Sequence, residues 1–216
     1  MKIILKNEGE KDYQIVENLT REAFWNLYCP GCTEHYLVHK MRLHPDFIKE
    51  LNIVAQVNGI IVGNIMYTQA WLNNERGQQL DIITFGPISV LPAYQRNGVG
   101  SALIQYTKEL ARTQGRHAIV ILGDPHNYCK HGFKSAKDFN ISDSRGYFPY
   151  GMLALELQVG SLAGHKWKYQ ESDVYNIDEQ KVKEYDKHFV EKKKGHQVSQ
   201  DIFSIAYRSY LMDIDQ

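Results

Sequence analysis

The chain has 216 residues, of which 43% are apolar and 23% charged, a composition typical of globular proteins and unlike disordered or fibrous ones. Lysine plus arginine and aspartate plus glutamate each number 25, so no net charge recruits nucleic acid or an anionic membrane. Three cysteines do not make a disulfide framework, and neither a signal-peptide core nor a membrane-spanning apolar run of roughly 20 residues is present. We therefore expect a cytoplasmic protein without nucleic-acid or membrane partners.

The N-terminal part predicts a strand followed by two helices. Residues 2–6 are β-prone, and residues 10–27 repeat apolar side chains every four positions, which predicts a helix with Ile15 and Leu19 on its buried face. A second helix is expected over residues 33–43, before a proline.

A hairpin and a long strand come next. Residues 51–57 and 60–71 flank Asn58-Gly59, a dipeptide that favours a tight turn because both positions tolerate positive φ. Residues 80–91 form an apolar strand interrupted by Gly86-Pro87, where a bulge or a splayed backbone is expected because proline removes a ladder donor.

The middle of the chain predicts a βαβ unit. Residues 98–112 carry an amphipathic helix pattern that Gly115 ends, and residues 118–122 are wholly apolar, as in a strand buried on both faces. Residues 152–159 alternate again and are expected to close the sheet. This order predicts an α/β fold with a mixed, partly antiparallel central sheet flanked by helices.

Patterning weakens after residue 159. Residues 164–167 resemble a loop, residues 177–194 are interpreted as a solvated helix, and residues 201–212 are apolar enough to pack on the core. We expect one domain over residues 1–159 and a packed C-terminal extension over residues 160–216.

A glycine-containing turn lies between the long strand and the amphipathic helix. Unpaired N–H groups and the positive end of the helix dipole meet there, which favours a phosphate, and glycine lets the backbone approach it. Neither the P-loop ending nor the three-glycine dinucleotide spacing is present. The expected phosphate-binding residues are Gln95, Arg96, Asn97, Gly98, Val99, Gly100 and Ser101.

Two separated motifs resemble the GNAT superfamily of acyl-CoA N-acyltransferases. Its Gln/Arg-x-x-Gly-x-Gly/Ala signature is matched by Gln95, Gly98 and Gly100, and Tyr128 stands four residues before a Gly-Phe pair, as in that family. The resemblance spans about residues 2–157 and is strongest to predicted acetyltransferases with a Gly-Asp-Pro-x-x-Tyr segment. It implies a GNAT-type fold with acetyl-CoA as cosubstrate.

The resemblance also implies roles for single residues. Acetyl-CoA would lie between the long strand and residues 118–122, with Ile88, Ser89 and Val90 along its pantetheine arm and Asn127 as a further hydrogen-bonding group. An amine would attack the thioester directly, and Tyr128, with an ordinary pKa near 10, would protonate the leaving thiolate. His126 is the candidate general base, although a water chain is an alternative.

The remaining hypotheses concern acceptor, metal and regulation. The acceptor is a small-molecule or peptide amine that the sequence does not identify, a homodimer is left open, and Phe24, Trp25, Tyr28 and Tyr36 are proposed to line the acceptor pocket or the core. Cys29 and Cys32 have a spacing similar to zinc ligands, and His35 and His39, one helical turn apart, could supply a second pair. The cysteine pair surrounds Pro-Gly without a thioredoxin-like context, however, so no metal is expected. The alternative function is a non-catalytic CoA or acyl-CoA sensor.

Overall fold

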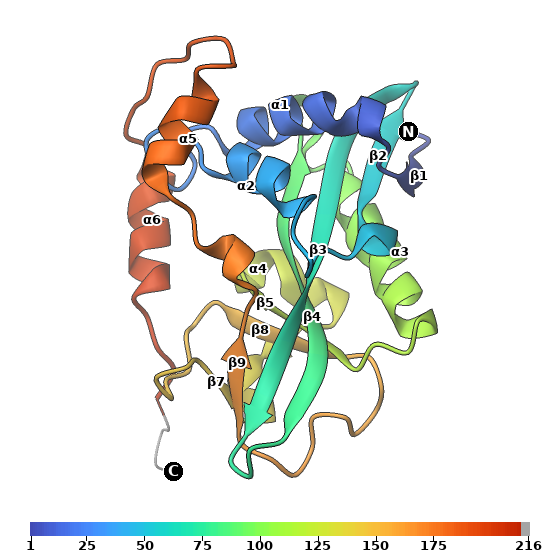
Figure 1. Cartoon of the computed structure of the whole chain (residues 1–216), viewed down its shortest axis with the longest axis vertical. Helices are drawn as coiled ribbons and strands as arrows, with labels where there is room; N and C mark the ends of the chain where they lie inside the picture. Colours follow the sequence, from blue (N-terminus) through green and yellow to red (C-terminus); the bar gives the residue numbers. More distant parts are fainter. Residues whose placement is uncertain (213–216) are drawn as a thin grey trace.

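The computed structural model describes residues 1–212, which form a curved mixed sheet with helices on both faces (Figure 1). The strands in chain order are β1 (Ile4–Asn7), β2 (Ile53–Val57), β3 (Ile60–Asn74), β4 (Gln79–Val90), β5 (Ala118–Leu122), β6 (Lys134–Ser135), β7 (Ile141–Ser142), β8 (Met152–Glu156) and β9 (Trp167–Gln170). The helices are α1 (Tyr13–Phe24), α2 (Glu34–Met41), α3 (Val99–Thr113), α4 (Pro125–Tyr128), α5 (Glu179–Asp186) and α6 (Val198–Tyr207).

The strand order is β1-β2-β3-β4-β5-β8-β6, and β4 and β5 are parallel while the other neighbours along this path are antiparallel. Strand β9 pairs with the end of β3 and, in parallel, with β7. The expected mixed α/β architecture is confirmed.

The β2–β3 hairpin forms as its turn residues predict. Asn58 and Gly59 have φ values of 51° and 82°, which the dipeptide adopts at low cost. Strand β3 then continues to Asn74 and turns into β4, and this long hairpin is the centre of the sheet.

The two faces of the sheet are covered by different helices. Ile65 and Met66 are neighbours in β3 and therefore point to opposite faces. Ile65 belongs to the apolar cluster that includes Leu103 of α3, whereas Met66 belongs to the cluster that includes Leu19 of α1. Gly63 allows α3 to approach closely, since a Cβ there would lie 2.9 Å from Val99 Cγ1.

The buried face of the first helix differs from the expectation. Val16 is completely buried with Leu19, whereas Ile15 is 47% exposed. Helix α1 begins at Tyr13 after a 3-10 turn and ends at Phe24, and Ile15 lies about 100° around the helix from Val16. The predicted buried face was therefore wrong at its first position, where Val16 and not Ile15 is buried.

Residues 164–167 were expected to be a loop, but Trp167 opens strand β9. Trp167 and Tyr169 are buried and alternate with exposed Lys168 and Gln170, a period-two pattern too short to stand out in sequence. The expectation that residues 152–159 complete the sheet was therefore incomplete, because β9 also joins it by pairing with β3 and β7. The helix expected over residues 177–194 is also shorter, because α5 ends at Asp186.

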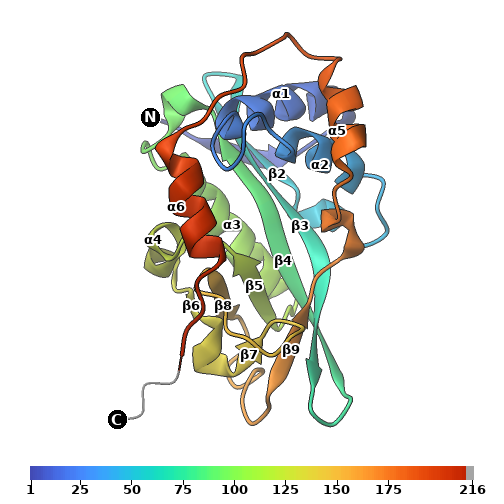
Figure 2. The same cartoon turned by 90° about the vertical axis from the view of Figure 1, so that its left-hand side faces the viewer.

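The C-terminal segment is fastened to the first two helices (Figure 2). Asp186 Oδ1 accepts a 2.7 Å hydrogen bond from buried Arg21 and lies 3.2 Å from His35 Nε2. The Tyr185 hydroxyl donates to Glu17 over 2.7 Å. Among the described helices, none combines the length and the apolar character that crossing a membrane requires.

Candidate active site

Strands β4 and β5 separate beside the middle of the sheet. Their parallel pairing is confined to Ile83 and Ile119, and β4 carries a register shift where Gly86-Pro87 lies opposite Met66. The bulge expected at Gly86-Pro87 is confirmed. Beyond the bulge β4 no longer pairs with β5, and its backbone faces the gap between these two strands.

The backbone beyond the bulge has groups directed into this gap. The Leu91 N–H donates to Val62 of β3 over 2.9 Å, so alternation directs the N–H groups of Ile88 and Val90 away from β3. The Val90 carbonyl accepts a 3.1 Å bond from the Gln95 amide, which also lies on the side away from β3. Val90 therefore offers an N–H donor to a ligand between the strands.

The glycine-containing turn begins α3 at the end of the same gap. Arg96 and Gly98 have positive φ values of 59° and 83°, and the first helical bond runs from the Ala102 N–H to the Gly98 carbonyl over 2.9 Å. The N–H groups of Val99 and Gly100 precede that bond, so they have no acceptor within the helix. Their dipoles favour an anion at this point.

Tyr128 closes the other side of the gap. It ends α4, which begins with Asp124 accepting the His126 N–H over 3.0 Å, and its ring packs on Phe85 and Phe133 with centroids 5.7 and 6.0 Å away. The ring covers Gly123, where a Cβ would overlap it.

Burial raises the pKa of the Tyr128 hydroxyl well above its usual range, and the nearby Tyr28 hydroxyl and Asp124 carboxylate add to this rise. Tyr128 is therefore protonated at neutral pH and is able to donate a proton. Because Tyr28 precedes α2 and interacts electrostatically with both Tyr128 and Asp124, the α1–α2 loop reaches the same site.

A set of polar side chains lies on the α1 face of the sheet near the bulge. The Tyr175 hydroxyl donates to the Gly86 carbonyl over 3.3 Å, and the Tyr169 hydroxyl is hydrogen-bonded to Thr84. Glu171 interacts electrostatically with both tyrosines. Its side chain is accessible to solvent, yet the surrounding protein raises its pKa.

The other expected residues have different surroundings. The Ser89 hydroxyl donates to Thr20 over 3.1 Å and is buried against α1, so only its backbone borders the strand edge. His126 and Asn127 are exposed on α4, and Ser101 Oγ lies 3.4 Å from His131 Nε2.

The residues with zinc-like spacing have other partners. The Cys32 thiol donates to Glu34, His35 faces Asp186, and His39 Nδ1 lies 3.1 Å from Glu17. A different group, His44 with Asp46 and Asp173, has its ligand atoms within 4.8 Å of one another. Its His44–Asp173 ion pair is 2.8 Å long, and the Asp173 side chain is 79% exposed.

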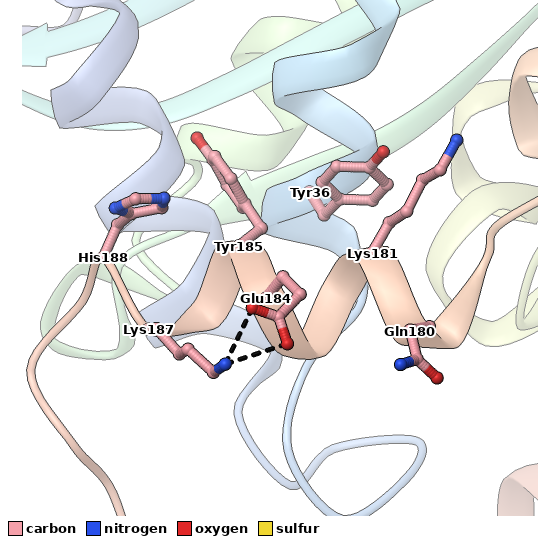
Figure 3. Close-up of a pocket in the computed structure, with 7 residues that line it drawn as sticks. All are labelled: Tyr36, Gln180, Lys181, Glu184, Tyr185, Lys187 and His188. Carbon is pink, nitrogen blue, oxygen red and sulfur yellow. Dashed lines mark hydrogen bonds and ion pairs between the residues drawn. The ribbon is translucent and has the colours of Figure 1, made fainter.

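Sequence reasoning missed Glu171, Tyr169 and Tyr175 as neighbours of the bulge. They follow the weakly patterned residues 160–166, and only the alternation of Trp167 and Tyr169 indicated a strand there. A surface hollow of about 450 Å³ lies elsewhere, between α2 and α5 (Figure 3), and is lined by Tyr36, Gln180, Lys181, Glu184, Tyr185, Lys187 and His188. The Lys187–Glu184 ion pair in it faces solvent, and no residue of the gap contributes to it.

In this mixed sheet the parallel strands β4 and β5 pair at one residue pair and then separate. A glycine-containing turn at the start of α3 lies beside the gap between them. This arrangement defines the GNAT-type acyl-CoA N-acyltransferase fold. The CoA complex of the GNAT family N-acetyltransferase YhbS from Escherichia coli superposes with a TM-score of 0.71 and 20% identity, covering 82% of this chain and 93% of that one. The acetyl-CoA complex of a GNAT family acetyltransferase from Brucella melitensis gives 0.65 and 21%, covering 81% and 98%.

The sequence comparisons agree with the fold. Residues 49–135 match the model of the acetyltransferase (GNAT) domain. YjhQ of Escherichia coli strain K12, described as an uncharacterized N-acetyltransferase, is 36% identical over an alignment of 126 residues that covers 53% of this chain and 66% of YjhQ. The match thus spans just under two thirds of that relative. Residues 49–135 are thus similar to the GNAT acetyltransferase domain, and the chain has the GNAT fold.

Proposed function

We propose that the protein is an N-acetyltransferase that moves the acetyl group of acetyl-CoA to a primary amine by direct attack. The observation that carries this proposal is the arrangement of three groups around one gap: free N–H groups at the start of α3, the outward N–H of Val90, and the protonated Tyr128. They match the phosphate, carbonyl and leaving thiolate of one acyl-CoA.

The chain binds the cosubstrate mostly through its backbone. The turn from Gln95 to Gly100 takes the pyrophosphate, with Arg96 at the exposed rim and Ser101 in the first turn of α3. Ile88, Ser89 and Val90 border the pantetheine arm. The Val90 N–H donates to the thioester carbonyl, where negative charge develops during attack.

The transfer needs two proton movements. A neutral amine nitrogen forms a bond to the carbonyl carbon, the C–S bond breaks, and Tyr128 donates its proton to the departing sulfur. A base takes the proton that the nitrogen loses. Glu171 replaces His126 as the base in our proposal because it interacts with Tyr169 and Tyr175 beside the bulge of β4, and because burial raises its pKa toward the range of an effective base.

The wider setting is part of the same proposal. Residues 1–159 form the acetyltransferase domain, residues 160–216 are an extension packed on it, and the protein works in the cytoplasm. Asn127 contributes to cosubstrate binding from α4.

Ligand-induced melting shifts and thiol release test the proposal. Acetyl-CoA raises the melting temperature where ATP does not, because a ligand that binds only the folded state stabilises it. Wild-type protein releases thiol from acetyl-CoA in the presence of amines. Stabilisation by CoA without thiol release on any amine would instead support the alternative, a CoA or acyl-CoA sensor.

A further inference from the structure

Helix α6 is held at its N-terminal end by the α1–α2 loop. The Gln200 side chain, only 8% exposed, donates to the Asn26 carbonyl over 2.9 Å and to the Gly195 carbonyl over 3.0 Å. Asn26 Oδ1 in turn accepts the N–H groups of Gly195 at 3.1 Å and Gly31 at 2.8 Å. The loop and the start of α6 therefore form one hydrogen-bonded unit.

The C-terminal end of α6 is held on the opposite side, by the segment that leads into β8. The Tyr150 N–H donates to Ser209 over 2.9 Å, and the Leu211 N–H donates to Phe148 over 2.8 Å. Gly151 in this segment accepts the Gly123 N–H over 2.8 Å, so the attachment lies directly beside the end of β5. Over its ten residues, about 15 Å, α6 connects the loop on the β4 side with the chain on the β5 side (Figure 2).

The inner side of α6 extends an aromatic series toward Tyr128. The Phe203 and Tyr28 rings have centroids 4.5 Å apart, and Tyr207 stacks on Phe203 at 5.8 Å. Tyr28 is close enough to Tyr128 and Asp124 for electrostatic interaction. Phe203 and Tyr28 are each still 39% exposed, which leaves ring surface for a ligand.

We propose that α6 and the α1–α2 loop form one wall of the acceptor site, and that this wall selects a small cationic amine that packs on Tyr28 and Phe203. The inference rests on the proposed acetyl transfer and names its acceptor class. In this proposal α6, which is attached at both ends, covers the acceptor side of Tyr128 and so excludes a lysine on a folded protein surface.

The charges near the wall fit an ammonium group. Asp124 and Glu34 both interact with Tyr28, and aromatic faces attract cations. Two lysines lie near the loop: Lys194 is beside Gly31 and Cys29, and Lys192 lies over the Trp25 ring and pairs with Glu22. An amine arrives protonated at neutral pH, so this combination attracts it before the base removes a proton.

The test compares Phe203→Ala with Ile205→Ala. Ile205 is on the same helix but 68% exposed, which makes it the matched control. Thiol release is measured with tyramine, with spermidine and with folded ubiquitin, and binding of tyramine and of spermidine is measured by calorimetry.

We expect wild type to use a small amine far better than ubiquitin. Phe203→Ala raises the KM for that amine about tenfold, because the lost aromatic contact, about 1 kcal/mol, and the lost apolar burial together reach about 1.4 kcal/mol, which is tenfold. The KM for acetyl-CoA stays unchanged, and Ile205→Ala behaves as wild type.

Equal effects of the two variants, or efficient acetylation of folded ubiquitin, would overturn the acceptor wall. If wild type released no thiol with any amine, acetyl transfer itself would fail. Tyramine binding that Phe203→Ala weakens would then still support the wall, and absence of binding of both small amines would refute it.

Discussion

Placing one methyl group at Gly123 tests how tightly the Tyr128 ring is positioned. A Cβ at Gly123 would lie 3.1 Å from Cδ2 of Tyr128 and closer still to Cε2, and the φ of this glycine is not in the left-handed region. Gly123→Ala is therefore allowed by its own backbone and forces the ring to move. Overpacking of this kind costs roughly 1–3 kcal/mol of stability.

The displaced hydroxyl also lowers the rate. A catalytic group misplaced by about 1 Å costs on the order of 10²-fold, so kcat for thiol release falls by that order while the KM for acetyl-CoA changes little. Gly9→Ala is the control, since a Cβ there meets Asp12 at an ordinary 3.8 Å. Urea unfolding and the thiol assay are run on both variants.

A double-mutant cycle separates the ring from other effects. In a Tyr128→Ala background the methyl group has no ring to meet, so Gly123→Ala should lose most of its stability cost. Wild-type stability and kcat in the single Gly123→Ala variant would refute the placement of Tyr128 over Gly123.

Three further predictions use other parts of the structure. Burial lowers the pKa of His35 to about 4, so between pH 6.5 and 4 the unfolded chain binds more protons than the folded chain. Urea unfolding should therefore show that His35 makes the protein about 2 kcal/mol less stable at pH 5 than at pH 7. His35→Gln should remove this contribution to the pH dependence. Gly98→Ala strains a φ of 83° by roughly 1–2 kcal/mol and should raise the KM for acetyl-CoA, which steady-state kinetics would detect. Glu171→Gln should lower kcat by roughly 10²-fold or more and abolish the acidic limb of the pH–rate profile. In wild type the midpoint of this limb should lie above the usual glutamate pKa, because burial raises the pKa of Glu171, and the control Glu179→Gln should keep the limb.

Local signals in the sequence predicted the centre of the fold. Asn58-Gly59 specifies its turn through backbone conformation alone, and Gly86-Pro87 specifies a break in β4 because proline cannot donate to the ladder. The turn before α3 is likewise local, since Gly98 and the first helical N–H groups are consecutive. Each feature depends on adjacent residues, so no tertiary information was needed.

Contacts between distant segments were not predictable in the same way. Glu171 and Phe203 reach the site only because β9 pairs with β3 and α6 attaches to Asn26. Four alternating residues in β9 are too few for a periodic signal. The apolar side chains of α6 also indicated burial, yet Ile205 is mostly exposed because only one side of the helix faces the protein.

The most direct test of the account is thiol release from acetyl-CoA by wild type and Tyr128→Phe with a panel of primary amines. We expect amine-dependent release that falls sharply in Tyr128→Phe, while acetyl-CoA still raises the melting temperature of both proteins. Unchanged release in Tyr128→Phe would contradict the role of Tyr128 as the acid, and a wild-type protein that does not bind acetyl-CoA would contradict the proposed function itself.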